Sequence, residues 1–268
     1  MIQQAAVVEV RNRVHQILAA MRDLPADERQ LHLEYLAGSA WRYAVTLQHV
    51  QRAWRRPMAG LRVIDIGAYP GHLAALLCLR ESAIVQAITL IQSPAVEAEM
   101  QRLGIAVSVC DVEREPLPAD DGSIQLVLCC ELVEHLVGDV RHMLVEAHRV
   151  LAPDGVFMLT TPNHASVKHR WELLRGRSVW PPLNDPLYPF YAGAGQRNPW
   201  RHVREFTVTE IRSLLHEAGF GHVDVTTQSP PFQIAGLSLR GFVSAALLQA
   251  AELFVPAGGT LILATARC

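Results

Sequence analysis

The sequence predicts an α/β protein built around a doubly wound, mostly parallel sheet. Short apolar segments alternate with segments of helical periodicity between residues 61 and 161. The first of these segments runs into a glycine turn and then a helix, the order typical of open parallel sheets. The chain has 268 residues and 50% of them are hydrophobic, so it can bury a sizeable core.

The N-terminal region is predicted to be helical. Residues 5–21 carry apolar side chains at helical spacing, and a second such pattern runs from Pro25 to residue 51. The segment RRPMAG, residues 55–60, then breaks the periodicity. We therefore expect a helical cap over residues 1–58.

The alternating region predicts five strands with helices between them. Its strand-like segments are rich in Val, Ile and Leu, and the intervening segments have helical spacing. The expected strands are 61–67, 83–91, 105–110, 123–130 and 155–161, and the expected helices are 71–82, 94–104 and 139–151.

The texture changes after Asn163. Trp, Pro, Tyr, Gly and Arg are frequent there without a clear period, which predicts a lid insertion over residues 166–201. A helix is expected at 207–220, and two strands are expected at 222–228 and 260–268. The expected core is therefore made of residues 59–165 and 202–268.

The apolar segment 238–255 is the longest in the last third of the chain. It is short for a membrane span and contains Glu252, so a buried or partner-facing helix is favoured over one lying on a membrane surface. The N-terminus lacks the charged-then-apolar order of a signal peptide. The five cysteines show no paired spacing, which favours a reducing, cytoplasmic setting.

The balance of charged residues indicates which class of partner the chain can bind. The formal net charge is -2, so no global basic field draws the chain to nucleic acid. A small-molecule or glycan substrate is the expected partner, and a homodimer is among the expected states.

The stretch VIDIGAYPGHLAALL, residues 63–77, predicts a ligand site. Ligands of open parallel sheets bind at the carboxyl ends of the strands. Asp65 ends the first strand, and Gly67 and Gly71 flank the turn, where they allow close approach of the backbone. The spacing Asp-x-Gly-x-x-x-Gly differs from the dinucleotide pattern, and by itself it is a common turn.

The downstream sequence is more specific. The pieces VIDIGAYPG, CDVE, LPADDGS, LVLCCELVEHL, HRVLAPDGVFMLTTPN and HVREFTVTEIRSLLHEAGF occur in this order over about 61–165 and 202–225. This series resembles the class I S-adenosylmethionine-dependent methyltransferases of the group called methyltransferase type 11. The resemblance implies a Rossmann-like, seven-stranded, mostly parallel sheet with a reversed final strand, and S-adenosylmethionine as the cofactor.

The resemblance also implies a set of cofactor-binding residues. Asp65, Gly67 and Gly71 would line the methionine end and the ribose, with Tyr69 in the turn between them. Gln92 would follow the second strand. Asp111 would meet the adenine amino group and Val112 would offer a backbone contact, while Cys130 and Glu131 would border the sulfonium. Carboxylates suit this role because they accept strong hydrogen bonds from ammonium, hydroxyl and amine groups.

Two positions depart from the family's pattern. Tyr69 stands where many members have glycine, and Gln92 stands where the ribose-binding acid is usual. One interpretation is a chain that kept the fold and lost the cofactor. The other is that Tyr69-Pro70 makes a rigid turn whose ring covers the cofactor, with reduced affinity.

The stretch CCELVEHL predicts a second site beside the first. Glu131, Glu134 and His135 occupy i, i+3 and i+4, so a helical turn would place them on one face. With His202 they would provide two carboxylates and two imidazoles for a divalent metal, Mg, Mn, Fe, Co or Zn. This pattern resembles the metal site of small-RNA terminal 2′-O-methyltransferases, and ubiquinone-pathway O-methyltransferases share its first part.

A metal-free interpretation stays open. His135 could be a general base or a wall residue, and Glu131 could touch only the cofactor. His164, after the fifth strand, is a second candidate base, and His72 could approach the cofactor.

The expected function is S-adenosylmethionine-dependent O-methylation of a hydroxyl on a small molecule or glycan, with or without assistance by the metal. The alternatives are N- or C-methylation of a small metabolite, or an inactive, methyltransferase-like binding subunit. The metal pattern also raises RNA methylation, which the near-neutral charge disfavours.

Overall fold

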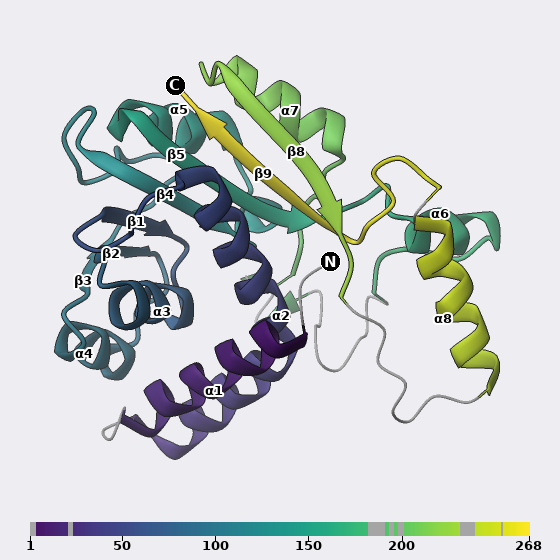
Figure 1. Cartoon of the computed structure of the whole chain (residues 1–268), viewed down its shortest axis with the longest axis horizontal. Helices are drawn as coiled ribbons and strands as arrows, with labels where there is room; N and C mark the ends of the chain where they lie inside the picture. Colours follow the sequence, from purple (N-terminus) through teal and green to yellow (C-terminus); the bar gives the residue numbers. More distant parts are fainter. Residues whose placement is uncertain are drawn as a thin grey trace.

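The computed structural model describes residues 4–20, 24–181, 191–192, 196–197, 201–230, 239–252 and 254–268. Over these residues the main sheet has seven strands in the order β3-β2-β1-β4-β5-β9-β8 (Figure 1). The strands are β1 (Arg62–Ile66), β2 (Ile84–Thr89), β3 (Ala106–Val109), β4 (Ile124–Cys130), β5 (Leu151–Pro162), β8 (His222–Gln228) and β9 (Leu261–Arg267).

The sheet is parallel except at β9. All pairs among β1 to β5 are parallel, whereas β9 runs antiparallel to both β5 and β8. The carboxyl ends of β1, β2, β3, β4 and β5 therefore meet at one edge, where ligands of such sheets bind. The predicted α/β class and the reversed final strand are confirmed.

Helices cover both faces of the sheet (Figure 1). They are α1 (Gln4–Ala20), α2 (Ala26–Trp54), α3 (His72–Glu81), α4 (Pro94–Arg102), α5 (Val140–Val150), α6 (Val167–Leu174), α7 (Val208–Glu217) and α8 (Leu239–Glu252), with a 3₁₀ turn η1 (Val133–His135). No helix of the described residues is long and apolar enough to cross a membrane.

Alternate strand residues feed two separate cores. Val63 and Leu126 join the core under α1 to α4, whereas Ile64 and Val127 join the core under α5 and α7. Successive side chains of a strand point to opposite faces, so a strand covered on both faces is apolar throughout. This is why the strand segments appear in the sequence as nearly continuous apolar runs.

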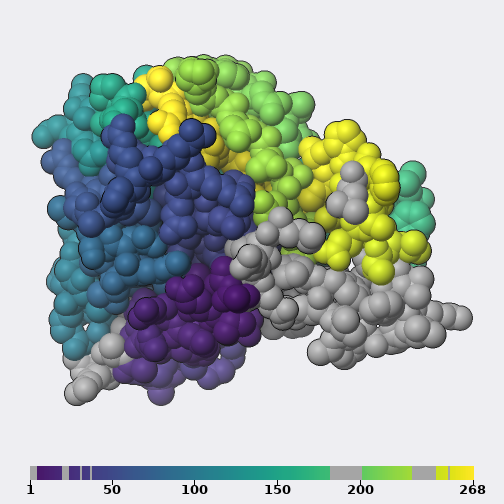
Figure 2. All heavy atoms as spheres, viewed as in Figure 1, coloured from purple at the N-terminus to yellow at the C-terminus, as the bar shows by residue number. Residues whose placement is uncertain are grey.

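The N-terminal helices lie where the sequence predicts a cap. Helix α1 packs against α2 and α3, and α2 also contacts β5 and β9. Figure 2 shows α1, in purple, on the surface beside the first half of the chain. Helix α2 ends at Trp54, and its C-cap Arg55, which has a left-handed φ of 57°, lies at the start of the predicted break. This arrangement brings side chains of α2 to the carboxyl edge of the sheet.

The expected lid is only partly described. Its first residues form helix α6, which the irregular composition did not predict, and this helix packs against α8. The two-residue strands β6 (Tyr191–Ala192) and β7 (Gln196–Arg197) pair with each other. Residues 182–190, 193–195 and 198–200 of the expected lid lie outside the described residues.

Local contacts set the start of one strand earlier than predicted and the start of one helix where it is predicted. Strand β5 starts at Leu151, four residues earlier than expected, because Leu151 pairs with Ile124 before a register shift. Helix α7 follows its N-cap Thr207, the residue at which the helix is predicted to begin, and the Thr207 hydroxyl and Glu210 form a capping box. Reciprocal bonds of this kind satisfy the first N–H groups of a helix, so they set where α7 begins.

Candidate active site

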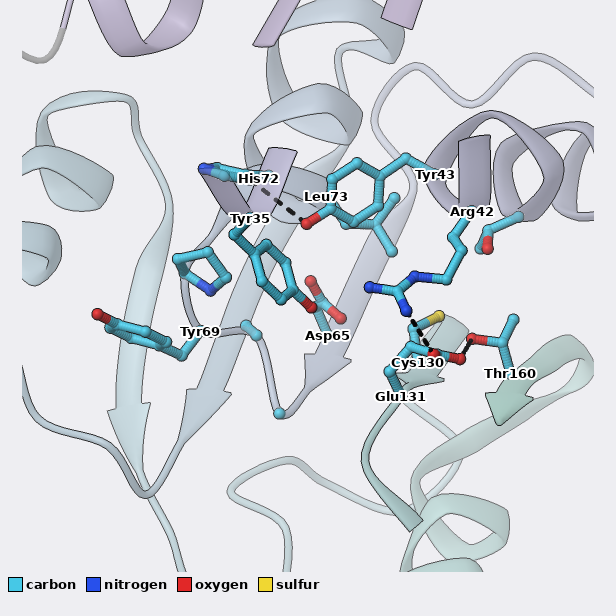
Figure 3. A pocket seen from close by; sticks show the side chains of 14 residues that line it. Tyr35, Arg42, Tyr43, Asp65, Tyr69, His72, Leu73, Cys130, Glu131 and Thr160 are labelled. Atoms are coloured by element: carbon cyan, nitrogen blue, oxygen red, sulfur yellow. Dashed lines mark hydrogen bonds and ion pairs between the residues drawn. The ribbon is translucent and has the colours of Figure 1, made fainter. Parts of the chain in front are cut away.

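A pocket opens at the carboxyl edge of β1 and β4 (Figure 3). The space in it that a water molecule could occupy is about 30 Å³, and the pocket is partly open to solvent. Its walls come from α2, the end of β1, the glycine turn, the start of α3, and the ends of β4 and β5. The glycine turn therefore borders a small cavity at the edge of the sheet where ligands of such sheets bind.

Asp65 is the buried acid of this pocket. Its side chain comes from β1, and the residue is 3% exposed. Burial raises the pKa of Asp65 from 3.8 to about 7, although a backbone hydrogen bond from Ala74 opposes the shift. A carboxylate held this far from water is stabilised by a cationic ligand.

The glycine turn needs its two glycines. Gly67 has φ +75° and Gly71 has φ +87°, a region in which L side chains are strained. A Cβ on Gly67 would lie 2.9 Å from Leu132, and one on Gly71 would lie 2.6 Å from the Cε of Met100. The turn can therefore bring its backbone close to a ligand only with glycine at these positions.

Tyr69 and Pro70 form the middle of the turn. The peptide bond between them is cis, and both residues line the pocket. The Tyr69 ring is half-buried and makes an edge-on contact with His32, with ring centroids 6.1 Å apart. The residue that departs from the family pattern thus forms a wall of the pocket.

Arg42 of α2 enters the same pocket. Its Nη1 lies 3.0 Å from Oε2 of Glu131, and Thr160 Oγ1 donates to Oε1 of Glu131 over 3.1 Å. Figure 3 shows Arg42 facing Glu131 beside Cys130 and Thr160. Burial raises the pKa of the Cys130 thiol well above its ordinary value, so it is a neutral side chain of the wall.

His72 lies deeper, at the start of α3. It is fully buried, with Nδ1 3.4 Å from the Tyr43 hydroxyl and Nε2 3.2 Å from Nδ1 of His32. Burial, together with His32, lowers the pKa of His72 to about 3. His72 is therefore a neutral hydrogen-bonding group in the wall.

The other expected cofactor residues follow neighbouring strands. Gln92 is exposed after β2, and Asp111 follows β3 with its Oδ1 accepting from the N–H of Glu113 over 3.1 Å. Val112 is buried next to it. These three do not line the pocket, but their strands end at the same edge of the sheet.

A second group of polar side chains surrounds η1. One ligand atom each from Glu134, His135 and His202 lie within 4.8 Å of one another. The N–H of Val203 donates to the carbonyl of Glu134 over 2.6 Å, which holds the returning chain beside η1. Glu134 is fully buried; its Oε2 accepts from Thr161 and its Oε1 has no hydrogen-bond partner.

Glu131 does not join this group. The predicted helical face over Glu131, Glu134 and His135 fails because only Val133–His135 are helical, as a 3₁₀ turn. Glu131 has φ +55°, and both its carboxylate oxygens are taken by Arg42 and Thr160. The acids are therefore divided between the pocket and the η1 group.

Glu205 links this group to a further one. Its Oε1 lies 2.9 Å from Nδ1 of His202, and its Oε2 lies 3.7 Å from Nδ1 of His164 and 3.6 Å from Nδ1 of His169. Burial alone would raise the pKa of Glu205, but the His202 hydrogen bond and the charge of these imidazoles lower it below its ordinary value. Glu205 is therefore a carboxylate anion in the middle of three histidines.

Comparison with known proteins identifies the family. A family model described as "Methyltransferase domain" matches residues 38–225, more than half of the chain. The chain belongs to the methyltransferase domain family. The match begins inside α2 and ends in β8, so it includes both groups of histidines and every residue that lines the pocket except Tyr35.

Similar proteins agree with this assignment. A "Probable S-adenosylmethionine-dependent methyltransferase" of Mycolicibacterium smegmatis is 28% identical over 162 residues, 60% of this chain and 52% of that protein. A "Ubiquinone biosynthesis O-methyltransferase" of Pseudomonas aeruginosa is 31% identical over 112 residues, 41% of this chain and 47% of that protein. The chain thus spans about half the length of these curated relatives.

Solved structures show the same fold. A methyltransferase from Archaeoglobus fulgidus, described as SAM-dependent, has a TM-score of 0.55 at 14% identity, covering 88% of this chain and 99% of that one. A phosphoethanolamine N-methyltransferase of Haemonchus contortus, in complex with S-adenosyl-L-methionine, has a TM-score of 0.51 at 15% identity, covering 83% and 51%. The class I methyltransferase fold predicted from the sequence is confirmed.

Several residues of this methyltransferase domain's site were missed by sequence reasoning. Tyr35, Arg42 and Tyr43 lie on α2, far in sequence from the motifs, and nothing in their spacing points to the pocket. Glu205 and His169 carried a weak signal, because each is a metal-ligand type within five residues of a histidine already singled out.

Proposed function

We propose that this protein transfers a methyl group from S-adenosylmethionine to a hydroxyl of a small molecule or glycan, with a divalent cation assisting. The observation that carries the proposal is the buried Asp65 beside a glycine turn, at the sheet edge that also presents Glu134, His135 and His202. One side of this edge suits a cationic nucleotide, and the other suits a cation that binds oxygen ligands.

The residues of the pocket fit the methionine end of the cofactor. Asp65 would accept from its ammonium group, and the Cβ-free turn at Gly67 and Gly71 would let the backbone approach. Arg42 would hold its carboxylate, because a guanidinium forms paired hydrogen bonds to such a group. Cys130 and Glu131 would border the sulfonium.

The remaining contacts would come from the neighbouring strands. Gln92 would hydrogen-bond a ribose hydroxyl without adding charge, while Asp111 would accept from the adenine amine and Val112 would offer its backbone. Tyr69 would cover the cofactor from the turn. When bound, S-adenosylmethionine supplies an activated methyl group on a good leaving group, so the protein's task is to align the acceptor oxygen.

The η1 group would hold the cation. Glu134 offers an oxygen without a hydrogen-bond partner, and His135 and His202 offer imidazole nitrogens. Glu205 would orient His202 by accepting from its Nδ1, the kind of carboxylate support that metal-binding histidines usually have. A cation there would polarise an acceptor hydroxyl and lower its pKa. Imidazole donors favour Mn, Fe, Co or Zn over Mg.

General-base catalysis is the metal-free form of the same proposal. His135 lies in the η1 group, and His164 follows β5 with a half-exposed side chain. Either imidazole could take the proton of the acceptor hydroxyl. The ubiquinone-pathway relative supports oxygen as the acceptor atom, whereas the Haemonchus structure belongs to an N-methyltransferase.

Calorimetry tests the cofactor part of the proposal. S-adenosylmethionine or its demethylated product should bind to the wild type, and Asp65→Ala should abolish the signal. Asp120→Ala, an exposed acid outside the pocket, is the matched control and should bind normally. No binding to the wild type would mean an inactive, methyltransferase-like subunit, and normal binding to Asp65→Ala would remove the assigned pocket.

Chelation tests the metal part. A chelator should stop methyl transfer to a catechol or vicinal diol acceptor without stopping cofactor binding, and Mn²⁺, Fe²⁺, Co²⁺ or Zn²⁺ should restore it. Turnover at the wild-type rate in chelator, together with a fully active His202→Ala, would leave His135 or His164 as the base.

A further inference from the structure

The group around Glu205 has the composition of a metal centre. His164, His169 and Glu205 each place one ligand atom within 4.8 Å of the other two. The three come from different segments: His164 follows β5, His169 lies in α6, and Glu205 precedes α7. Two imidazoles and one carboxylate are a known ligand set for a zinc ion that keeps a position open for water or substrate.

The distances suit a small cation. Oε2 of Glu205 lies 3.7 Å from Nδ1 of His164 and 3.6 Å from Nδ1 of His169. Neither distance is a normal hydrogen bond. Ligand atoms about 2.1 Å from a tetrahedral zinc ion are about 3.4 Å from one another. A cation bound by Oε2 and the two Nδ1 atoms would draw Oε2 toward each imidazole by a few tenths of an ångström, and it would displace the contact of His169 Nδ1 with the carbonyl of His164, 3.1 Å away.

Two of these atoms have no other partner. Nδ1 of His164 and Oε2 of Glu205 are buried atoms without a hydrogen bond. The Glu205 side chain is 10% exposed, so its unpaired oxygen lies inside the protein. Buried polar atoms in native proteins are nearly always satisfied, and an ion is one of the few groups that can satisfy both of these.

The backbone holds the three ligands in place. The N–H of His164 donates to the carbonyl of Phe206 over 2.9 Å, and Asn163 forms a bridge with Phe206. Ser166 caps α6 by accepting from the N–H of His169. A site supported in this way loses little conformational entropy when it binds its ion.

We propose that His164, His169 and Glu205 form a second divalent-cation site, of the zinc or cobalt class, next to the one at Glu134, His135 and His202. Glu205 would serve both sites, with Oε2 as a ligand of the second cation and Oε1 holding His202 for the first. The side chain of His164 is 38% exposed, although its Nδ1 is buried. Two neighbouring cations would hold two adjacent oxygens of one acceptor, such as a diol.

This inference concerns cation binding and does not depend on the proposed methyl transfer. The full chain is stripped of metal with a chelator, dialysed, and titrated with Co²⁺ and with Zn²⁺. Calorimetry and elemental analysis give the number of ions bound, and the visible absorption of Co²⁺ reports four-coordinate binding. The wild type should bind two ions.

The variants separate the two sites. His169→Ala should bind one ion and lose part of the Co²⁺ absorption, and Glu134→Gln should also bind one. His222→Ala, an exposed histidine at the start of β8, is the control and should bind two. Circular dichroism checks each fold, and if His169→Ala does not fold, His164→Gln carries the same readout.

Two results would overturn the second site: one ion on a folded wild type that is lost in Glu134→Gln but kept in His169→Ala, or no ion at all. One ion lost in His169→Ala and kept in Glu134→Gln would support the second site and remove the first. S-adenosylmethionine binding is measured separately. Two bound ions without cofactor binding would contradict the proposed function and still support both cation sites.

Discussion

Replacing Asp65 by asparagine should stabilise the cofactor-free protein and abolish cofactor binding. The pKa of Asp65 rises from 3.8 to about 7 because the carboxylate is buried. One pKa unit corresponds to about 1.4 kcal/mol, so ionised Asp65 lowers the free energy of unfolding by about 4 kcal/mol at most. Asparagine has the same shape and can accept the Ala74 hydrogen bond, but it carries no charge to desolvate.

The loss of folding stability caused by the burial of ionised Asp65 grows as the pH rises. Between pH 4 and about 7 the unfolded chain has lost the proton of Asp65 while the folded chain keeps it. The stability that comes from protonated Asp65 is therefore complete below pH 4, falls as the pH rises to about 7, and changes little above that. From pH 5 to pH 8 the wild type should lose about 2 to 3 kcal/mol relative to Asp65→Asn.

Urea denaturation of both proteins without cofactor, at pH 5 and at pH 8, measures this difference. Asp120→Asn, which changes an exposed acid, serves as the control. Calorimetry with S-adenosylmethionine should show binding to the wild type and none to Asp65→Asn. The reasoning about Asp65 is refuted if the stability gap between wild type and variant is the same at the two pH values.

The remaining predictions concern the turn, the arginine and the two acids. Gly71→Ala should lower the free energy of unfolding by about 1–3 kcal/mol, measured in urea, because its Cβ would meet Met100 at φ +87°; an unchanged midpoint would contradict this. Arg42→Met should weaken S-adenosylmethionine binding about tenfold or more in calorimetry, since the carboxylate would lose its charged donor; unchanged affinity would remove Arg42 from the site. Glu131→Gln should keep the full number of bound Zn²⁺ ions in elemental analysis, whereas Glu134→Gln should lose one; equal loss in both would place Glu131 among the ligands.

The sequence by itself determined the order of the seven strands along the chain and the position of the glycine turn, but not helix α6. Strands covered on both faces must be apolar throughout, and turns with positive φ need glycine, so Val63 to Gly71 could be interpreted without coordinates. The sequence also predicted that Glu134, His135 and His202 could hold one metal, because of their residue types and the resemblance of the pattern to known metal sites.

Only the tertiary structure decided that Glu131 belongs to the pocket and Glu134 to the η1 group. Glu131 lies outside the η1 group because its left-handed φ breaks the helical turn that the i, i+3, i+4 spacing predicts. Its carboxylate forms an ion pair with Arg42 instead. Arg42 itself comes from α2, 89 positions earlier in the chain. Long-range contacts of this kind arise from packing, and no local periodicity encodes them.

The contact of Glu205 with three histidines has the same origin. His164, His169 and His202 lie on segments that the chain brings together only when Phe206 bonds to the end of β5 and Ser166 caps α6. In the sequence, no motif around any of these histidines indicates that it will contact Glu205. Residue spacing determines which side chains share a strand or helix face, but the packing of separate segments determines which buried charges meet.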